Sequence, residues 1–259
     1  MLPHASPASG IPARSEATRP QSFDRVAVRY EGKTLLDADL SPQSREQYRR
    51  LAATLHHMQA RQGIKVIMVT SALVGEGKTL TASNVALTLS QSYQKQVLLV
   101  DADLRRPSLQ AVFGIKSHVG LTDGLTAEDE RPVQVHQVTS RLGILPAGRA
   151  TSDPIAALTS ERMRRLVEEA RNTFDWVILD TPPVTLITDA SLVSAIADGT
   201  VVVVKAGHTP WDLVDRTVNA IGRERMLGIV LNHSTTAAEG YGYYQDDYYY
   251  GTTGDDARS

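Results

Sequence analysis

Short apolar runs alternate with stretches of helical periodicity from Lys65 to Asn232. Such runs are typical of parallel strands buried on both faces, and most of the helical stretches have about the length that crossover connections need. The pattern predicts an α/β fold: a three-layer sandwich in which helices cover both faces of a mostly parallel central sheet. The predicted strands are residues 65–70, 96–100, 143–145, 176–179, 200–204 and 228–231.

The predicted helices between these strands are residues 78–91, 108–113, 160–172, 189–195 and 210–224. Another helix is predicted from Pro42 to about Gln62, before the first strand. Leu51, Leu55 and Met58 recur there at helical spacing and form one apolar face. Such a face packs on a sheet more often than it carries a catalytic group.

The two ends of the chain differ from this pattern. Residues 1–40 begin with a stretch rich in Pro, Ser, Ala and Arg, which predicts a flexible leader or linker. Residues 41–232 form the predicted domain. Residues 233–259 contain no large aliphatic side chain and are expected to be a flexible tail. The tail holds a tyrosine cluster: Tyr241, Tyr243, Tyr244, Tyr248, Tyr249 and Tyr250.

Composition narrows the classes of function. The chain has 259 residues with a formal net charge of −2, which argues against broad electrostatic attraction to nucleic acid or anionic lipid. Cysteine is absent, so disulfides, thiolate-bound zinc and thiol catalysis are excluded. No signal peptide and no apolar run of bilayer-spanning length is apparent. We therefore expect a cytoplasmic chain that reaches a membrane through a partner.

The segment from Ser71 to Thr79 joins the first predicted strand to its helix and is the strongest candidate for chemistry. Gly75 and Gly77 would let backbone N–H groups surround phosphate oxygens, and the start of the helix adds a positive dipole end. Lys78 would reach the β- and γ-phosphates, and the Thr79 hydroxyl is placed to ligate Mg²⁺. A P-loop is therefore predicted. Because Ala72 stands where the strict motif has glycine, a simple glycine-rich turn is the alternative.

Carboxylates follow two other predicted strands. Asp101 and Asp103 come directly after the second strand, and Asp180 follows the strand that begins at Trp176. Ligands of open α/β sheets lie at the carboxyl ends of strands, so these side chains should emerge near the phosphate loop. Such carboxylates can hold Mg²⁺ or accept a proton from an attacking hydroxyl. Left unpaired, Asp101 and Asp103 would repel each other, so a cation or Arg105 is needed nearby, and we expect Arg105 to neutralise them. The alternative to a chemical role is a polar loop with a salt bridge.

The order of these motifs resembles that of the bacterial tyrosine kinases of capsule and exopolysaccharide synthesis, P-loop proteins related to the Min and Par ATPases. The resemblance runs from about Ser44 to Tyr250. Besides the phosphate loop, the carboxylates and the terminal tyrosines, three segments match the family: Arg105-Arg106-Pro107, Leu145-Pro146-Ala147-Gly148 and Gly228-Ile229-Val230-Leu231-Asn232.

The resemblance implies a role for each matching residue. Lys78, Asp101, Asp103 and Arg105 correspond to catalytic positions, and Asp101 to the carboxylate that activates the tyrosine hydroxyl. Thr79, Asp103 and Asp180 match positions that handle Mg²⁺. The positions that bind ATP correspond to Gly75, Glu76, Gly77, Lys78, Thr79, Leu80 and Asn232, with Asn232 against adenine. The six tail tyrosines correspond to a cluster that is autophosphorylated. The extended tail is long enough to reach the site of a neighbouring subunit, so we expect transfer mainly between subunits.

The chain departs from the family's pattern in its N-terminal helix, and from that of the related Min and Par ATPases in its phosphate loop. Glu46 and Arg49 fit the motif of the family's oligomer-forming helix, but Ala52 replaces its second arginine, which puts ring assembly in doubt. Leu73 replaces the signature lysine of the Min and Par ATPases. A positioning ATPase of that kind and a nucleotide-binding regulatory subunit are the alternative functions. For a kinase, the resemblance implies self-association, a membrane-embedded polysaccharide co-polymerase as activator, and a cognate phosphatase.

Overall fold

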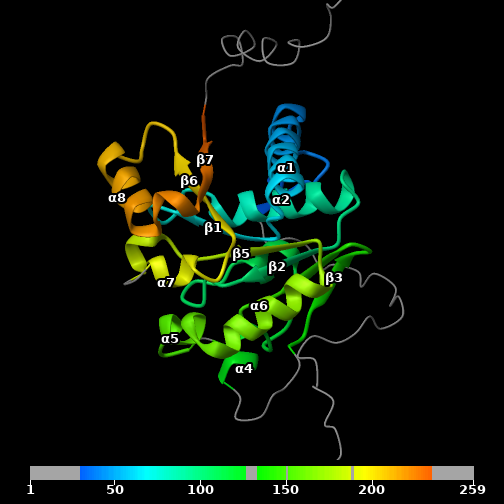
Figure 1. The fold of residues 1–259 in the computed structure, drawn as a ribbon. Helices are drawn as coiled ribbons and strands as arrows, with labels where there is room; N and C mark the ends of the chain where they lie inside the picture. The colour runs from blue at the N-terminus through cyan, green and yellow to red at the C-terminus, as the bar shows by residue number, and fades with distance from the viewer. Residues whose placement is uncertain (1–29, 127–132, 150, 188–189, 235–259) are drawn as a thin grey trace, which may run out of the picture.

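A computed structural model describes residues 30–126, 133–149, 151–187 and 190–234. Their centre is a seven-stranded sheet in the order β3-β4-β2-β5-β1-β6-β7, in which only β3 runs antiparallel to its neighbour (Figure 1). The predicted mostly parallel sheet is confirmed. The strands are β1 (Val66–Ser71), β2 (Val97–Asp101), β3 (His136–Thr139), β4 (Leu142–Leu145), β5 (Trp176–Asp180), β6 (Gly199–Lys205) and β7 (Met226–Asn232).

Helices cover both faces of this sheet (Figure 1). One face carries α1 (Pro42–Gln62), α2 (Lys78–Gln91) and α3 (Leu109–Phe113). The other carries α4 (Leu121–Thr126), α5 (Pro154–Thr159), α6 (Glu161–Thr173), the 3-10 turn η2 (Val184–Leu186), α7 (Ala190–Ser194) and α8 (Trp211–Ile221). A second 3-10 turn, η3 (Arg223–Arg225), precedes β7. The expected three layers are therefore present.

The alternation of side chains along the central strands builds two separate cores. In β1, Val66 and Met68 enter the core under α4–α8, whereas Ile67 and Val69 enter the core under α1–α3. All of the β1 and β2 residues are buried, which explains why these strands read as continuous apolar runs. Burial on both faces fixes the register of the strands, and therefore also the positions of the polar residues that follow them.

Local signals set the helix ends. Ser41 caps α1 by accepting a hydrogen bond from the Ser44 N–H at 3.1 Å, and Pro42 begins the helix. Gly63 ends it in the left-handed conformation, with φ of 70°. The bounds of α1 and α2 agree with the prediction, while the other predicted elements are shifted by a few residues at their ends.

Part of the predicted leader belongs to the folded domain. Residues 30–40 form a series of turns in which Tyr30, Thr34 and Leu40 are buried. Asn84 of α2 holds this segment, since its Oδ1 accepts from the Leu35 N–H at 2.8 Å and its Nδ2 donates to the Lys33 carbonyl at 3.0 Å. The predicted flexible leader, residues 1–40, therefore extended too far at its C-terminal end. The tail tyrosines lie outside the described residues.

Candidate active site

The phosphate loop spans residues 72–77 between β1 and α2, as predicted. Gly75 and Gly77 have φ of 87° and 94°, which residues with a Cβ rarely adopt. The first hydrogen bond of α2 runs from the Thr81 N–H to the Gly77 carbonyl at 2.9 Å. The N–H groups of residues 78–80 therefore precede the intrahelical bonds, and Leu80 enters the site through its backbone. This arrangement suits a bound phosphate.

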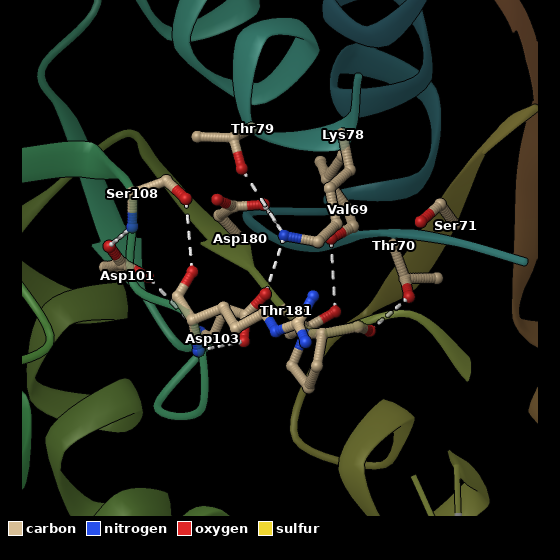
Figure 2. A network of polar contacts seen from close by, with 12 residues as sticks. Val69, Thr70, Ser71, Lys78, Thr79, Asp101, Asp103, Ser108, Asp180 and Thr181 are labelled. Carbon is tan, nitrogen blue, oxygen red and sulfur yellow. Dashed lines mark hydrogen bonds and ion pairs between the residues drawn. The ribbon is translucent and has the colours of Figure 1, made fainter. Parts of the chain in front are cut away.

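Lys78 lies at the centre of the site, between the carboxylates of two strands (Figure 2). Its Nζ is 2.9 Å from Asp103 Oδ2, 3.5 Å from Asp180 Oδ1 and 3.4 Å from Thr79 Oγ1. Burial alone would lower the pKa of Lys78, but the Asp180 and Asp103 carboxylates raise it above its ordinary value. Lys78 therefore stays charged and offsets the negative charge of this cluster.

Asp101 is fully buried at the end of β2. Its Oδ2 accepts from the Ser108 N–H at 2.9 Å, and its Oδ1 accepts from the Asp103 N–H at 3.3 Å (Figure 2). Oδ2 also accepts from the Leu109 N–H at 2.9 Å. Burial, followed by the nearby charge of Asp180, raises the pKa of Asp101 to about 7, although the backbone hydrogen bonds oppose the rise. A carboxyl group with this pKa can exchange a proton near neutral pH.

Asp180 ends β5 and is also fully buried. Neither of its carboxylate oxygens has a hydrogen-bond partner among the described residues. Burial raises the pKa of Asp180, while the charge of Lys78 acts in the opposite direction. Lys78 Nζ, 3.5 Å from Oδ1, supplies the charge that offsets this burial, and a metal ion would have to take over that task once Lys78 turns toward phosphate.

The donor set around Asp180 fits Mg²⁺. Hard oxygen donors are present in Asp180, Asp103 and the Thr79 hydroxyl, and Lys78 now lies among them. Across the described ranges, no group of three or more His, Asp or Glu side chains could hold a metal ion unaided. In nucleotide sites Mg²⁺ takes one or two protein ligands and completes its shell with phosphate and water.

Arg105 does not neutralise the Asp101 and Asp103 pair, and that expectation was wrong. Its side chain is exposed and makes no ion pair with any residue that the structure describes. Lys78 takes the position instead, because it reaches Asp103 from the start of α2. The Arg106 N–H also contributes, donating to Asp103 Oδ1 at 3.0 Å.

Known proteins share this sequence and architecture. A family model described as ParA, NUBPL iron-transfer P-loop NTPase, matches residues 63–255. The tyrosine-protein kinase YwqD of Bacillus subtilis is 35% identical over 77% of this chain and 85% of its own length. The chain belongs to the bacterial tyrosine kinases of the P-loop class. The kinase domain of the Escherichia coli tyrosine kinase ETK superposes with a TM-score of 0.71 at 26% identity, covering 90% of this chain and 93% of that domain.

A longer relative places the same domain in a larger protein. The succinoglycan biosynthesis transport protein ExoP of Rhizobium meliloti is 36% identical over 72% of this chain, which covers 24% of ExoP. The match to named tyrosine kinases does not favour the Min and Par alternative, in keeping with Leu73 at the signature position.

Two of the nucleotide-binding residues predicted for this kinase contact each other. Asn232, the last residue of β7, donates through Nδ2 to the Glu76 carbonyl at 2.8 Å. A Cβ on Gly77 would lie 2.1 Å from the same Nδ2, so the Asn232 side chain rests directly on the phosphate loop. The Glu76 side chain is buried and turns toward the junction of β6 and α8. The contact of Asn232 with adenine stays a prediction.

Threonines that the sequence analysis did not single out hold the loops in place. Thr70 Oγ1 donates to the Pro182 carbonyl at 2.8 Å, and Thr185 Oγ1 donates to the Ala72 carbonyl at 2.8 Å. The Thr181 hydroxyl donates to the Val69 carbonyl at 3.1 Å (Figure 2). These bonds join the end of β1 to the segment after β5. The sequence signal for these contacts was the presence of threonine at the carboxyl ends of the adjacent strands β1 and β5.

The oligomerisation motif of the family is only partly present. On α1, Arg49 Nη1 lies 3.8 Å from Glu46 Oε2, and Arg50 also pairs with Glu46 at 3.4 Å. Ala52 is completely buried against the core. The position of the missing arginine therefore faces inward, and an arginine side chain would have to leave this core.

Proposed function

We propose that this chain transfers the γ-phosphoryl group of ATP to tyrosine hydroxyls, and that the tail tyrosines of a second copy are its acceptors. The observation that carries the proposal is the gathering of Lys78, Asp101, Asp103 and Asp180 at one edge of the sheet, next to the phosphate loop. Phosphoryl transfer needs positioning and charge stabilisation more than covalent chemistry, and these residues supply both.

Each residue has one task in this reaction. Lys78 turns from Asp103 and Asp180 toward the β- and γ-phosphates, which frees both carboxylates. Asp180, Asp103 and Thr79 would hold Mg²⁺, and a bound Mg²⁺ would neutralise charge on the phosphate oxygens. Asp101 accepts the proton of the tyrosine hydroxyl as its oxygen bonds to the γ-phosphorus. The bond from that phosphorus to the bridging oxygen breaks, and ADP leaves.

The length of the tail allows it to reach the active site of a neighbouring subunit. The stretch from Asn232 to Tyr241 spans at most about 30 Å when extended. This is enough to enter the site of an adjacent copy. Each phosphotyrosine adds about −1.5 to −2 charges, close to Asp246 and Asp247. Unmodified tails therefore promote association, and modified tails promote release.

The relatives support a cellular setting for this kinase. The name of ExoP links this domain to succinoglycan synthesis and transport, and we assign this kinase to the control of capsule or exopolysaccharide production. No helix in the described ranges is long and apolar enough to cross a bilayer. We place the chain in the cytoplasm, recruited to the inner membrane face by a membrane-embedded co-polymerase, with a tyrosine phosphatase to reverse the modification.

Incubation of the purified chain with labelled ATP and Mg²⁺ tests this proposal. Phosphotyrosine on residues of the tail is the expected product, with or without stimulation by the cytoplasmic segment of a co-polymerase. Free phosphate without labelled protein would instead indicate a positioning ATPase. Nucleotide binding without either product would indicate a regulatory subunit.

A further inference from the structure

Glu76 is the one carboxylate within the phosphate loop, and its side chain is 1% exposed. Its Oε2 accepts from the Leu73 N–H at 2.6 Å, within the same loop. Its Oε1 accepts from the Lys205 N–H at 3.3 Å and from the Thr209 hydroxyl. Three protein donors thus hold this carboxylate, so it is not directed at a phosphate. A buried carboxylate satisfied in this way fixes the groups that donate to it.

The backbone of Glu76 makes a second connection in the same direction. Its carbonyl accepts from Asn232 Nδ2 at 2.8 Å. Asn232 is the register partner of Lys205 across β6 and β7, and its own carbonyl accepts from the Ala206 N–H at 2.8 Å. One residue of the phosphate loop is therefore bonded to the ends of both β6 and β7.

The order of the strands shows what this connection joins. β1, which leads into the phosphate loop, lies between β5 and β6. Asp101 and Asp180 end β2 and β5 on one side of β1, where the terminal phosphate and Mg²⁺ would lie. A nucleotide laid along this edge must extend its nucleoside toward the other side, over the ends of β6 and β7. Glu76 links the phosphate half of the site to the nucleoside half.

We propose that Glu76 is a positioning residue that holds these two halves in the spacing that a whole nucleotide requires. The inference rests on the proposed binding of ATP at this loop and deepens it. The Glu76 side chain itself does not contact the ligand. Its effect is to preorganise the site, which increases affinity for ligands that span both halves more than for ligands that occupy only one.

Comparison of ADP with inorganic pyrophosphate, both with Mg²⁺, measures this effect. Neither ligand can donate a γ-phosphoryl group, so affinity is read without turnover. The quantity of interest is the ratio of the pyrophosphate Kd to the ADP Kd in the full chain. Glu76→Gln keeps the size of the side chain but leaves one acceptor oxygen for donors on both sides. We expect the ratio to fall about tenfold, the effect of losing one hydrogen bond to a charged group.

Two variants of Thr209 test the same link from outside the phosphate loop. Thr209→Val removes the hydroxyl that reaches Glu76, and should lower ADP affinity while pyrophosphate affinity stays at the wild-type value. Thr209→Ser keeps the hydroxyl and should restore the wild-type ratio. The double variant Glu76→Gln with Thr209→Val should lose little beyond Glu76→Gln alone, because the two residues act through one contact.

The outcomes separate this inference from the proposed function. A wild-type ratio in folded Glu76→Gln would show that Glu76 only braces its own loop, and the inference would be wrong. If Glu76→Gln fails to fold, the Thr209→Val and Thr209→Ser pair decides, and equal ratios for the two would overturn the link. If the wild-type chain binds neither ADP nor pyrophosphate, the proposed function itself fails.

Discussion

Asp101 and Asp180 are register partners on the neighbouring parallel strands β2 and β5, and both carboxyl groups are fully buried. Burial is the main reason that the pKa values of both residues are raised, and a nearby like charge adds to the rise, from Asp180 for Asp101 and from Asp103 for Asp180. Lys78 reaches Asp180 but not the hydrogen-bonded oxygens of Asp101. The pair therefore separates into a cation-binding carboxylate and a carboxyl group that can take up a proton.

Kinase activity should rise with pH to a plateau, with a midpoint near 7, because Asp101 must lose its proton to act as a base. Initial rates of tail phosphorylation across the pH range measure this. Asp101→Asn should lower the rate by about 10²–10⁴-fold. It should also abolish the rise in activity near pH 7. If the variant still shows that rise, a group other than Asp101 causes it.

Removal of the Asp180 charge should shift the pH at which kinase activity rises. Asp180→Asn eliminates the like charge beside Asp101, so the pKa of Asp101 should fall and the rise in activity should occur at lower pH. The same variant loses a carboxylate ligand and should need more Mg²⁺ for half-maximal rate. Titration with Mg²⁺ at fixed ATP, at two pH values, measures both effects. An unchanged Mg²⁺ requirement would contradict the assignment of Asp180.

The stability of the nucleotide-free chain should depend on Asp101. The folded chain holds its proton up to about pH 7, whereas an unfolded aspartate has a pKa of about 3.9. The stabilisation is complete below the lower value and is lost as pH rises through the higher one. Asp101→Asn should therefore gain stability relative to wild type as pH rises from about 4 to about 7, by at most about 1.4 kcal/mol per pH unit, and the gain should level off above pH 7. Urea unfolding at several pH values measures the difference.

Lys78→Met should destabilise the nucleotide-free fold. The change leaves Asp103 and Asp180 without their cation in a site where the Lys78 side chain is only 12% exposed. Breaking one partner of a buried ion pair costs about 3–5 kcal/mol. The loss should be larger at pH 8 than at pH 5.5, because protonation relieves the orphaned carboxylates at low pH. Equal losses at the two pH values would contradict the pairing.

Gly77→Ala should weaken the chain and its nucleotide binding together. The φ of 94° strains any residue with a Cβ, and the new methyl group would meet Asn232 Nδ2. We expect a loss of about 1–3 kcal/mol in the free energy of unfolding. Gly207→Ala is a matched control, since Gly207 has a φ of 66° but a methyl group added there would have no neighbouring atom within 4 Å. Gly207→Ala should lower the free energy of unfolding without changing the affinity for nucleotide.

The central sheet could be predicted because its strands are buried on both faces and are therefore continuously apolar. β3 could not, since His136–Thr139 is a short edge strand with a mixed burial pattern. α5 was also missed, although Asp153 before Pro154 is a cap signal, and Asp153 Oδ1 accepts from the Ala156 N–H at 3.1 Å. Short elements carry too few periodic positions to stand out.

The site was predictable as far as each residue follows a strand or begins a helix. Lys78, Asp103 and Asp180 converge for that reason. The pairing of charges was not predictable, because Arg105 is nearer to Asp103 in sequence while Lys78 is nearer in space. The inward turn of Glu76 depends on Lys205 and Thr209, which are far away in the chain. Such long-range contacts leave no local pattern.

Transfer between copies tests the central claim most directly. A full-length Lys78→Met chain, which keeps its tail but lacks the phosphate-binding lysine, is mixed with an active chain truncated after Ser234, and labelled ATP and Mg²⁺ are added. The account predicts phosphotyrosine on the tail of the Lys78→Met chain and none when either chain is incubated alone. An unlabelled Lys78→Met tail, in a preparation where the intact wild-type chain labels itself, would contradict transfer from one subunit to the tail of another.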